Sequence, residues 1–223
     1  MFMGMGMPIP DLSNLPGSSR PGGGGGTPPG PPSLPKIDNL YSFEFDGVGT
    51  YIFAGNIDAL NNQSSFSTSA WFKCDTVSGA PIIINGGSSA SNRFYIQLLT
   101  TGTTIRYVMG STVKDTTVSN VADGKWHHVV TIHNGTSLEV YLDGTKEGTF
   151  TTVSPNTNIG RSFTIGKYIL NSSNYFNGYL DEIGVFNTAL TQEQVESIYN
   201  ATTTGKTANL SSLSSVAWYR MGD

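Results

Sequence analysis

Cysteine, histidine and charged residues are all scarce in this chain of 223 residues. Its single cysteine, Cys74, excludes an internal disulfide and a zinc site built from several thiolates. The fold must therefore be held by its core alone, which fits maturation in a reducing compartment. Charged residues make up only 13% of the chain and the net charge is −4, so the attraction on which non-specific nucleic-acid binding depends is missing. We do not expect nucleic acid as a partner.

Long apolar runs are missing as well. No stretch approaches the roughly 18 apolar residues of a membrane-spanning helix. Residues 1–8 lack both the basic segment and the unbroken apolar run of an export signal. We therefore expect no membrane partner, and synthesis in the cytoplasm.

Proline and glycine, by contrast, are concentrated at the start of the chain. Residues 1–36 hold nine of the 11 prolines and nine of the 27 glycines. Such a segment buries too little apolar surface to fold by itself, so we predict an extended arm over residues 1–36 and a separate domain over residues 37–223. Adaptable apolar side chains near the beginning of the arm are expected to dock into grooves of a partner protein; they are Met1, Phe2, Met3, Met5, Met7 and Ile9.

Residues 37–223 predict an all-β fold. About a dozen short β-rich runs, each bounded by Gly, Asn, Asp or Ser, are typical of a two-sheet antiparallel jelly-roll sandwich. These runs are residues 41–45, 51–54, 66–73, 82–85, 93–99, 104–109, 126–133, 138–142, 149–153, 163–166, 177–186 and 216–220. One short helix is expected after Thr191, because Thr191 and Gln194 form a capping pair ahead of an apolar stripe.

Two aspartates are candidate calcium ligands. Asp46 precedes a glycine, and turn chemistry explains it only in part; the same chemistry accounts for Asp143, which also precedes a glycine. Asp181 lies within a strand-like run, where it either accepts hydrogen bonds from a neighbouring loop or supplies a carboxylate to Ca²⁺. Because Asp181 and Glu182 are consecutive, their side chains are expected on opposite faces of the strand.

Catalysis is not expected. His127 and His128 should point to opposite faces of one strand and cannot readily share a metal, and no nucleophile–histidine arrangement has its usual local setting. Exposed tyrosines are the remaining functional signal, since their rings could stack on sugars; the alternative is that they fill the core. The tyrosines that could line a concave sheet are Tyr41, Tyr51, Tyr95, Tyr107, Tyr168, Tyr175 and Tyr179. The candidates for the sugar platform itself are Tyr95, Tyr107, Tyr175 and Tyr179.

Several short segments together resemble the laminin G-like, concanavalin A-like lectin/glucanase superfamily, over nearly all of residues 38–223. In order, the matching segments are residues 45–47, 66–73, 123–129, 140–144, 175–183 and 189–191. The resemblance implies a jelly roll that binds glycans or proteins at one face or rim, with calcium in some members; a calcium site would fall on Asp181 and on Asp46. The Glu-x-Asp-x-x-Glu strand motif of the glucanase members is absent from residues 180–184, so hydrolase activity is not carried over.

The sandwich, the Met/Gly/Pro-rich arm and the missing export signal together resemble bacteriophage virion proteins. The expected function is therefore a non-enzymatic virion structural protein, a capsid decoration or fibre component made in the host cytoplasm. Its arm would dock on neighbouring capsid or tail proteins, and copies would form a homo-oligomer in the assembly. The alternative is a carbohydrate-binding adhesin, with or without Ca²⁺, that recognises host surface polysaccharide.

Overall fold

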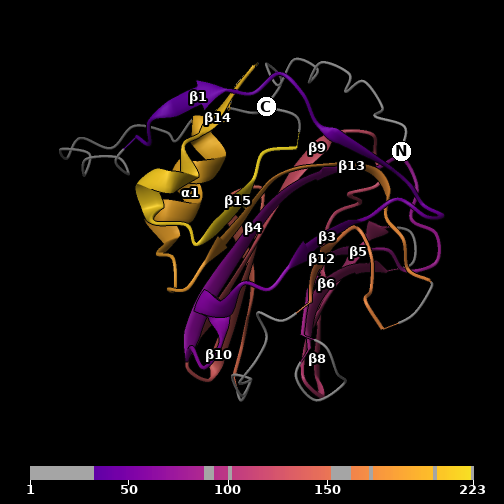
Figure 1. The fold of residues 1–223 in the computed structure, drawn as a ribbon, viewed down its shortest axis with the longest axis horizontal. Coiled ribbons are helices and arrows are strands. Elements are labelled where there is room, and N and C mark those ends of the chain that lie inside the picture. The colour runs from indigo at the N-terminus through magenta and orange to yellow at the C-terminus, as the bar shows by residue number, and fades with distance from the viewer. Residues whose placement is uncertain are drawn as a thin grey trace, which may run out of the picture.

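Two antiparallel sheets face each other, and one helix lies outside one of them (Figure 1). The computed structural model describes residues 33–87, 93–99, 102–151, 162–170, 173–202 and 205–221. The predicted all-β sandwich with one short helix is confirmed. The six apolar residues of the arm, from Met1 to Ile9, lie outside the described residues.

The helix packs on the larger of the two sheets. This seven-stranded sheet has the order β11 (Thr145–Phe150), β10 (Ser137–Leu142), β9 (Trp126–Asn134), β4 (Ser65–Lys73), β13 (Asn177–Phe186) and β15 (Ala217–Tyr219), and β2 (Phe43–Asp46) also pairs with β13. The six-stranded sheet has the order β3 (Ile52–Gly55), β12 (Phe163–Ile165), β5 (Ile82–Gly86), β6 (Phe94–Leu99), β7 (Thr104–Met109) and β8 (Thr112–Thr117). The remaining elements are α1 (Gln192–Ala201), the β1 (Lys36–Asp38) and β14 (Lys206–Ala208) pair, and the 3₁₀ turns η1 (Asp58–Leu60) and η3 (Leu210–Leu213).

Apolar side chains fill two layers of the molecule. The main core lies between the sheets and is rich in fully buried phenylalanines: Phe45, Phe66, Phe72, Phe163 and Phe176. A second cluster lies under α1, where Val195 and Ile198 pack against Val130 and Ile132 of β9. The capping box of Thr191 and Gln194 begins the helix as the sequence predicts. No helix among the described residues is long and apolar enough to cross a membrane.

The residues just before the expected domain boundary also contact the domain. Leu34 packs against the cluster under α1, and the Pro35 carbonyl accepts a hydrogen bond from the Asn209 amide at 2.7 Å. The boundary expected between residues 36 and 37 therefore falls inside β1, because this segment is held by its pairing with β14.

A cross-strand row runs over the outer face of the six-stranded sheet, away from the core. Neighbouring strands place the following residues directly opposite one another in this row: Phe53, Thr164, Asn85, Tyr95, Val108 and Val113. A turn follows β12 at Gly166, whose φ of +80° allows the chain to reverse beside Phe45. The Thr164 hydroxyl donates to the Lys167 carbonyl at 2.9 Å, so the turn that carries Lys167 and Tyr168 is fixed to the strand beside this row.

Candidate functional site

Two tyrosine rings hold a lysine at the edge of the six-stranded sheet. The Lys167 ammonium lies 4.5 Å from the ring centroid of Tyr51 and 5.1 Å from that of Tyr175. The two rings are 6.3 Å apart and tilted relative to each other. A cation at these distances from two ring faces is attracted by both. We call these three residues the lysine cluster.

A second pair of tyrosines holds an arginine in the same way. The Arg93 guanidinium lies 5.5 Å from the Tyr95 centroid and 5.8 Å from the Tyr168 centroid. The Arg93 Nη1 donates to the Tyr168 hydroxyl at 2.5 Å, and its Nε donates to the Gly110 carbonyl at 3.3 Å. The two rings meet edge to face at 5.2 Å. We call these three residues the arginine cluster.

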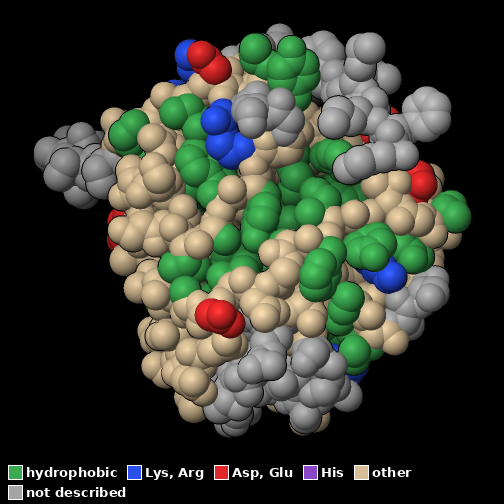
Figure 2. Space-filling model, in the orientation of Figure 1, with side chains coloured by type: hydrophobic (Ala, Val, Ile, Leu, Met, Phe, Trp, Pro, Cys, Tyr) green, Lys and Arg blue, Asp and Glu red, His purple; other side chains and the backbone are tan. Residues whose placement is uncertain are grey.

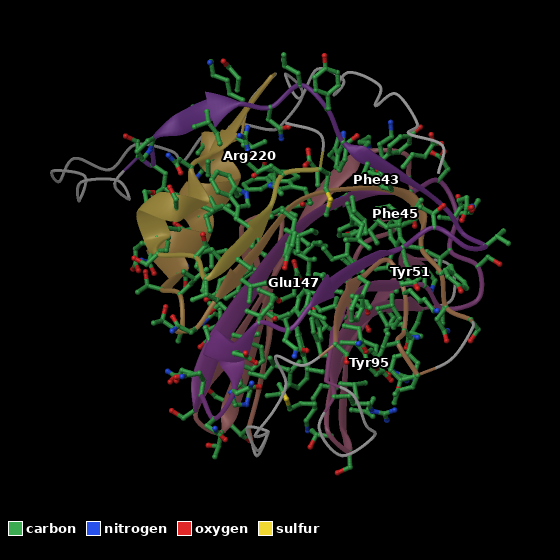
Figure 3. The ribbon with its side chains drawn as sticks, in the orientation of Figure 1. Phe43, Phe45, Tyr51, Tyr95, Glu147 and Arg220 are labelled. Atoms are coloured by element: carbon green, nitrogen blue, oxygen red, sulfur yellow. The ribbon has the colours of Figure 1, made fainter. Side chains whose placement is uncertain are left out.

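The two clusters are joined by the turn after β12, because Lys167 belongs to one and Tyr168 to the other. Together the six residues form what we call the tyrosine–cation surface. Tyr51 is 41% exposed, and Figure 3 shows Tyr51 and Tyr95 on the side of the molecule occupied by the six-stranded sheet. Figure 2 shows a basic side chain among hydrophobic ones on the same side.

Within the described part of the chain, the positive charges of Lys167 and Arg93 are not paired with carboxylates. Among the described residues neither Lys167 nor Arg93 forms an ion pair with a carboxylate, whereas Arg106 on the same sheet is closed by Asp115 at 2.7 Å. Burial raises the pKa of the Tyr95 phenol above its usual range, so this hydroxyl stays protonated and able to donate. The surface therefore presents cations, ring faces and phenol groups.

The four tyrosines expected to form one platform are separated in the structure. Tyr95 and Tyr175 lie in the two clusters, but Tyr107 points into the core and is only 3% exposed. The prediction that Tyr107 belongs to a surface platform is wrong, because successive residues of β7 point to opposite faces of the sheet and Tyr107 lies on the core face. Tyr179 lies on β13 of the other sheet, where its hydroxyl donates to Glu44 and its ring contacts Lys73.

The sequence pattern does not single out the two basic residues of this surface. Tyr51 and Tyr168 are among the seven tyrosines that could line a concave sheet, but they are not among the four predicted for the platform. The available signal is modest: a basic residue beside an aromatic one in Lys167-Tyr168, and a basic residue at the entry of a strand in Arg93-Phe94-Tyr95. What brings them together is the turn at Gly166, which no local pattern specifies.

Asp46 has a structural role in its turn. Its Oδ1 accepts hydrogen bonds from the backbone amides of Val48, Gly49 and Thr50 at 2.8 to 2.9 Å. These three amides hold the pKa of the Asp46 carboxyl far below its usual range. The carboxylate therefore fixes the β2–β3 loop, and the structure adds nothing in favour of a calcium ion there.

Asp181 and Glu182 lie beside one small cavity. Asp181 pairs with Trp71, but the register shifts before Gly184, and Glu182 adopts a φ of +51°. With this bulge both residues line the same cavity of about 20 Å³, so the expectation that their side chains lie on opposite faces is wrong. The cavity is lined by Asn39, Trp71, Trp126, Asp181, Glu182, Thr202 and Thr207. It has room for a water molecule but not for a sugar.

The groups around this cavity do not fit a calcium ion. Calcium takes six to eight oxygen ligands, whereas the indole N–H groups of Trp71 and Trp126 are buried there without a partner. The Asp181 carboxylate already accepts from the Asn39 amide at 3.0 Å and from the Glu182 backbone amide at 2.8 Å. Within the described part of the chain, no group of three or more His, Cys, Asp and Glu side chains could hold a metal.

One serine–histidine pair exists but lacks the geometry of a nucleophile. The Ser69 hydroxyl lies 2.8 Å from His128 Nε2 beneath α1, where both residues are buried. His128 Nδ1 has no hydrogen-bond partner, so no carboxylate orients the ring, as it does in a catalytic triad. The rings of Trp71, His128 and Tyr199 lie nearly parallel to one another, with centroids 4.8 to 6.2 Å apart. Since Tyr199 belongs to α1, these contacts hold the helix on the sheet.

The family model of the concanavalin A-like lectin/glucanases superfamily matches residues 46–196, more than half of the chain. The chain belongs to the concanavalin A-like lectin/glucanases superfamily. The resemblance inferred from the sequence segments is thereby confirmed for the family. No curated protein sequence matches the chain significantly.

The chain is similar in structure to several solved proteins. The heptameric SAP-like pentraxin of Limulus polyphemus is 20% identical, with a TM-score of 0.55, over 72% of this chain and 82% of the pentraxin. Domain 4 of the arabinanase AbnA from Geobacillus stearothermophilus, solved with arabinotriose, is 20% identical with a TM-score of 0.56, over 74% of this chain and 80% of that one. The CBM40 of a Ruminococcus gnavus sialidase is 13% identical with a TM-score of 0.58, over 75% of this chain and all of the module. At these identities the likeness shows a shared fold.

Nothing in these likenesses bears on a bacteriophage particle. The three neighbours are a pentraxin, a domain of an arabinanase and a module of a sialidase. The virion role, the anchoring of the arm and homo-oligomer formation stay predictions. They concern residues 1–32 and an assembly that the structure does not describe.

Proposed function

We propose that the protein is a lectin-like, non-catalytic carbohydrate-binding domain, and that its tyrosine–cation surface is where the sugar binds. The observation that carries this proposal is the pairing of four tyrosine rings around two basic side chains, one pair beside the edge strand β3 and the other beside β6 of the same sheet. Aromatic rings offer the flat apolar faces on which the C–H groups of a sugar ring pack. The virion location and synthesis in a host cytoplasm stay separate predictions, which this proposal does not need.

The structural neighbours support the proposal without supplying its site. The arabinanase domain was solved with arabinotriose, and the sialidase module was also solved with α2,3-sialyllactose. That second structure is 12% identical to this chain, with a TM-score of 0.58 over 75% of this chain and all of the module. We infer that the present chain uses the same fold for the same class of ligand. The calcium-dependent form of this function is not favoured, because neither Asp46 nor Asp181 offers a suitable set of ligands.

A glycan array with the full chain tests the proposal, followed by titration of the best ligand into variants. Tyr51→Ala and Tyr95→Ala should each weaken binding about tenfold, since each removes a stacking face. Tyr41→Ala is the matched control, because Tyr41 is an equally exposed tyrosine outside the surface. The proposal is contradicted if no glycan binds, or if the three variants bind alike. Mass spectrometry of the bound glycan should show no cleavage product.

A further inference from the structure

Every polar side-chain group of the tyrosine–cation surface can donate a hydrogen bond, and none is a carboxylate or an amide oxygen. The ammonium of Lys167 and the guanidinium of Arg93 have no acceptor capacity, and the phenols are the only groups that can do both. A neutral sugar hydroxyl both donates and accepts, so a site that holds it well needs acceptors such as carboxylate or amide oxygens beside its donors. The six residues include none.

Both cations retain donors that can reach a ligand. Arg93 uses its Nε and one hydrogen of Nη1, so about three of its five N–H donors remain. The Lys167 ammonium is attracted by two ring faces and carries three N–H donors, none of which forms a hydrogen bond or an ion pair among the described residues. The rings also position both cations, which reduces the side-chain entropy lost when an anion binds.

The surrounding charges leave these cations uncompensated. Of the basic residues in the described part of the chain, Arg106, Lys125, Lys146, Lys206 and Arg220 are each paired with a carboxylate. Lys36, Lys73, Lys114, Lys167 and Arg93 are not paired with a carboxylate within that part. Of these five, Lys167 and Arg93 belong to the two clusters that the turn after β12 joins. In a chain of net charge −4, this is a local concentration of unpaired positive charge beside aromatic rings.

We propose that this surface selects anionic sugars, those that carry a carboxylate or a sulfate, with Lys167 and Arg93 as the specificity-determining residues. The inference rests on the proposed carbohydrate-binding function and adds the class of ligand. A sugar ring packs on a tyrosine face while its anionic group accepts hydrogen bonds from the ammonium or the guanidinium, which are stronger than hydrogen bonds between neutral groups.

Isothermal titration with matched ligand pairs tests the selection. The pairs are sialyllactose and lactose, oligogalacturonate and its methyl ester, and a sulfated galactan oligosaccharide and its desulfated form. We expect at least one anionic member to bind about ten times more tightly than its neutral partner, and its affinity to fall as NaCl is raised from about 50 to about 300 mM. The first two pairs report on carboxylate and the third on sulfate.

Lys167→Gln should weaken binding of that anionic ligand about tenfold and bring it close to the neutral partner. Lys114→Gln is the matched control, because Lys114 also lies over an aromatic ring, Phe150, but outside the surface. Arg93→Gln gives a second, independent reading. Equal affinity for both members of every pair, or an unchanged affinity in Lys167→Gln, overturns the inference.

The failure of this inference can be told apart from failure of the proposed function. If neutral glycans bind and Tyr51→Ala abolishes their binding while Lys167→Gln does not, the surface binds sugar and the anionic selection is wrong. A third outcome is that every polyanion, dextran sulfate included, binds equally and that the tyrosine variants bind as well as the parent chain. Non-specific attraction between charges would then explain the binding, and the inference would be wrong.

Discussion

The Nδ1 atom of His127 lies 2.8 Å from Oδ2 of Asp143, which joins the start of β9 to the turn between β10 and β11. On its other side, His127 Nε2 lies 3.1 Å from Oδ1 of Asp123. Asp143 also accepts from the His128 backbone amide at 2.7 Å through its second oxygen. Two aspartates that precede glycines thus do more than shape their turns, because one imidazole bridges them.

This bridge predicts a loss of stability as the pH rises through neutrality. Burial, the largest influence, lowers the pKa of His127, but the hydrogen bonds and charges of Asp143 and Asp123 together outweigh it and raise the pKa above its ordinary 6.5. The folded state therefore binds the proton more tightly than the unfolded state, so this contribution is complete below pH 6.5 and is lost above it. The free energy of unfolding in urea should be measured for the parent chain and for His127→Gln between about pH 5.5 and 8. The difference between the two should fall as the pH rises, because the contribution of His128 is common to both and cancels.

The upper limit near pH 8 keeps a second group out of the measurement. Burial raises the pKa of the Cys74 thiol to about 11, so the thiolate formed in the unfolded state above about pH 9 destabilises the fold separately. A Cys74→Ala background serves as the control. Parallel pH profiles for the parent chain and His127→Gln would show that the bridge contributes nothing.

His128 predicts the opposite slope on the acid side. Complete burial lowers its pKa to about 4, so the folded state resists protonation while the unfolded state accepts it near pH 6.5. Stability is therefore present above pH 6.5 and falls towards pH 4, by up to about 3 kcal/mol. The His128→Gln variant should lose less stability between pH 6.5 and pH 4 than the parent chain does. An NMR titration in which the His128 ring protonates near pH 6.5 would refute the assignment.

Gly166 is expected to be intolerant of a side chain. A Cβ at this position would lie 2.4 Å from two ring atoms of Phe45, whereas a Cβ at Gly55, with a similar φ of +76°, would meet nothing within 4 Å. Gly55→Ala should cost about 1 kcal/mol from backbone strain alone, and Gly166→Ala about 3 kcal/mol, because overpacking is added. Guanidinium unfolding of both variants measures the difference. Equal costs would mean that the ring of Phe45 yields to the new methyl group.

Asp181 is expected to stabilise the fold without calcium. Asp181→Ala removes the acceptor of the Asn39 amide and of the Glu182 backbone amide, which should cost about 1–3 kcal/mol. The melting temperature of the parent chain should be the same in millimolar Ca²⁺ and in EDTA, since a bound ion would raise it. A calcium-dependent rise in the parent chain that is absent in Asp181→Asn would restore the metal interpretation.

The framework can be predicted from the sequence because the strands are locally consistent. The strands at 104–109 and 177–186 have the expected bounds, and the capping box at Thr191 begins the helix. The β8 strand is not among the expected runs, because Thr112–Thr117 has one large apolar residue, Val113, and its polar composition suits an exposed edge strand. The strand expected at 149–153 begins earlier, at Thr145, directly after the Asp143-Gly144 turn.

The site is harder to predict than the fold. Alternation along β7 places Tyr107 with Ile105 and Met109 on the core face, so its burial could have been inferred from the pattern. The bulge that places Asp181 and Glu182 at the same cavity could not have been inferred from the sequence, because the residue with the left-handed φ is Glu182 and not a glycine. The convergence of Arg93 and Lys167 depends on a turn between distant strands, and local periodicity carries no information about such a contact.

The most direct measurement is the set of backbone amide shifts that change when the preferred glycan is titrated into isotopically labelled full chain. We predict that the largest changes lie at Tyr51, at Arg93 to Tyr95, at Lys167 and Tyr168, and at Tyr175. Tyr41 and Tyr179 should stay unaffected. Changes concentrated on β13 and β2 around Tyr179, with the tyrosine–cation surface unmoved, would contradict carbohydrate binding at this surface.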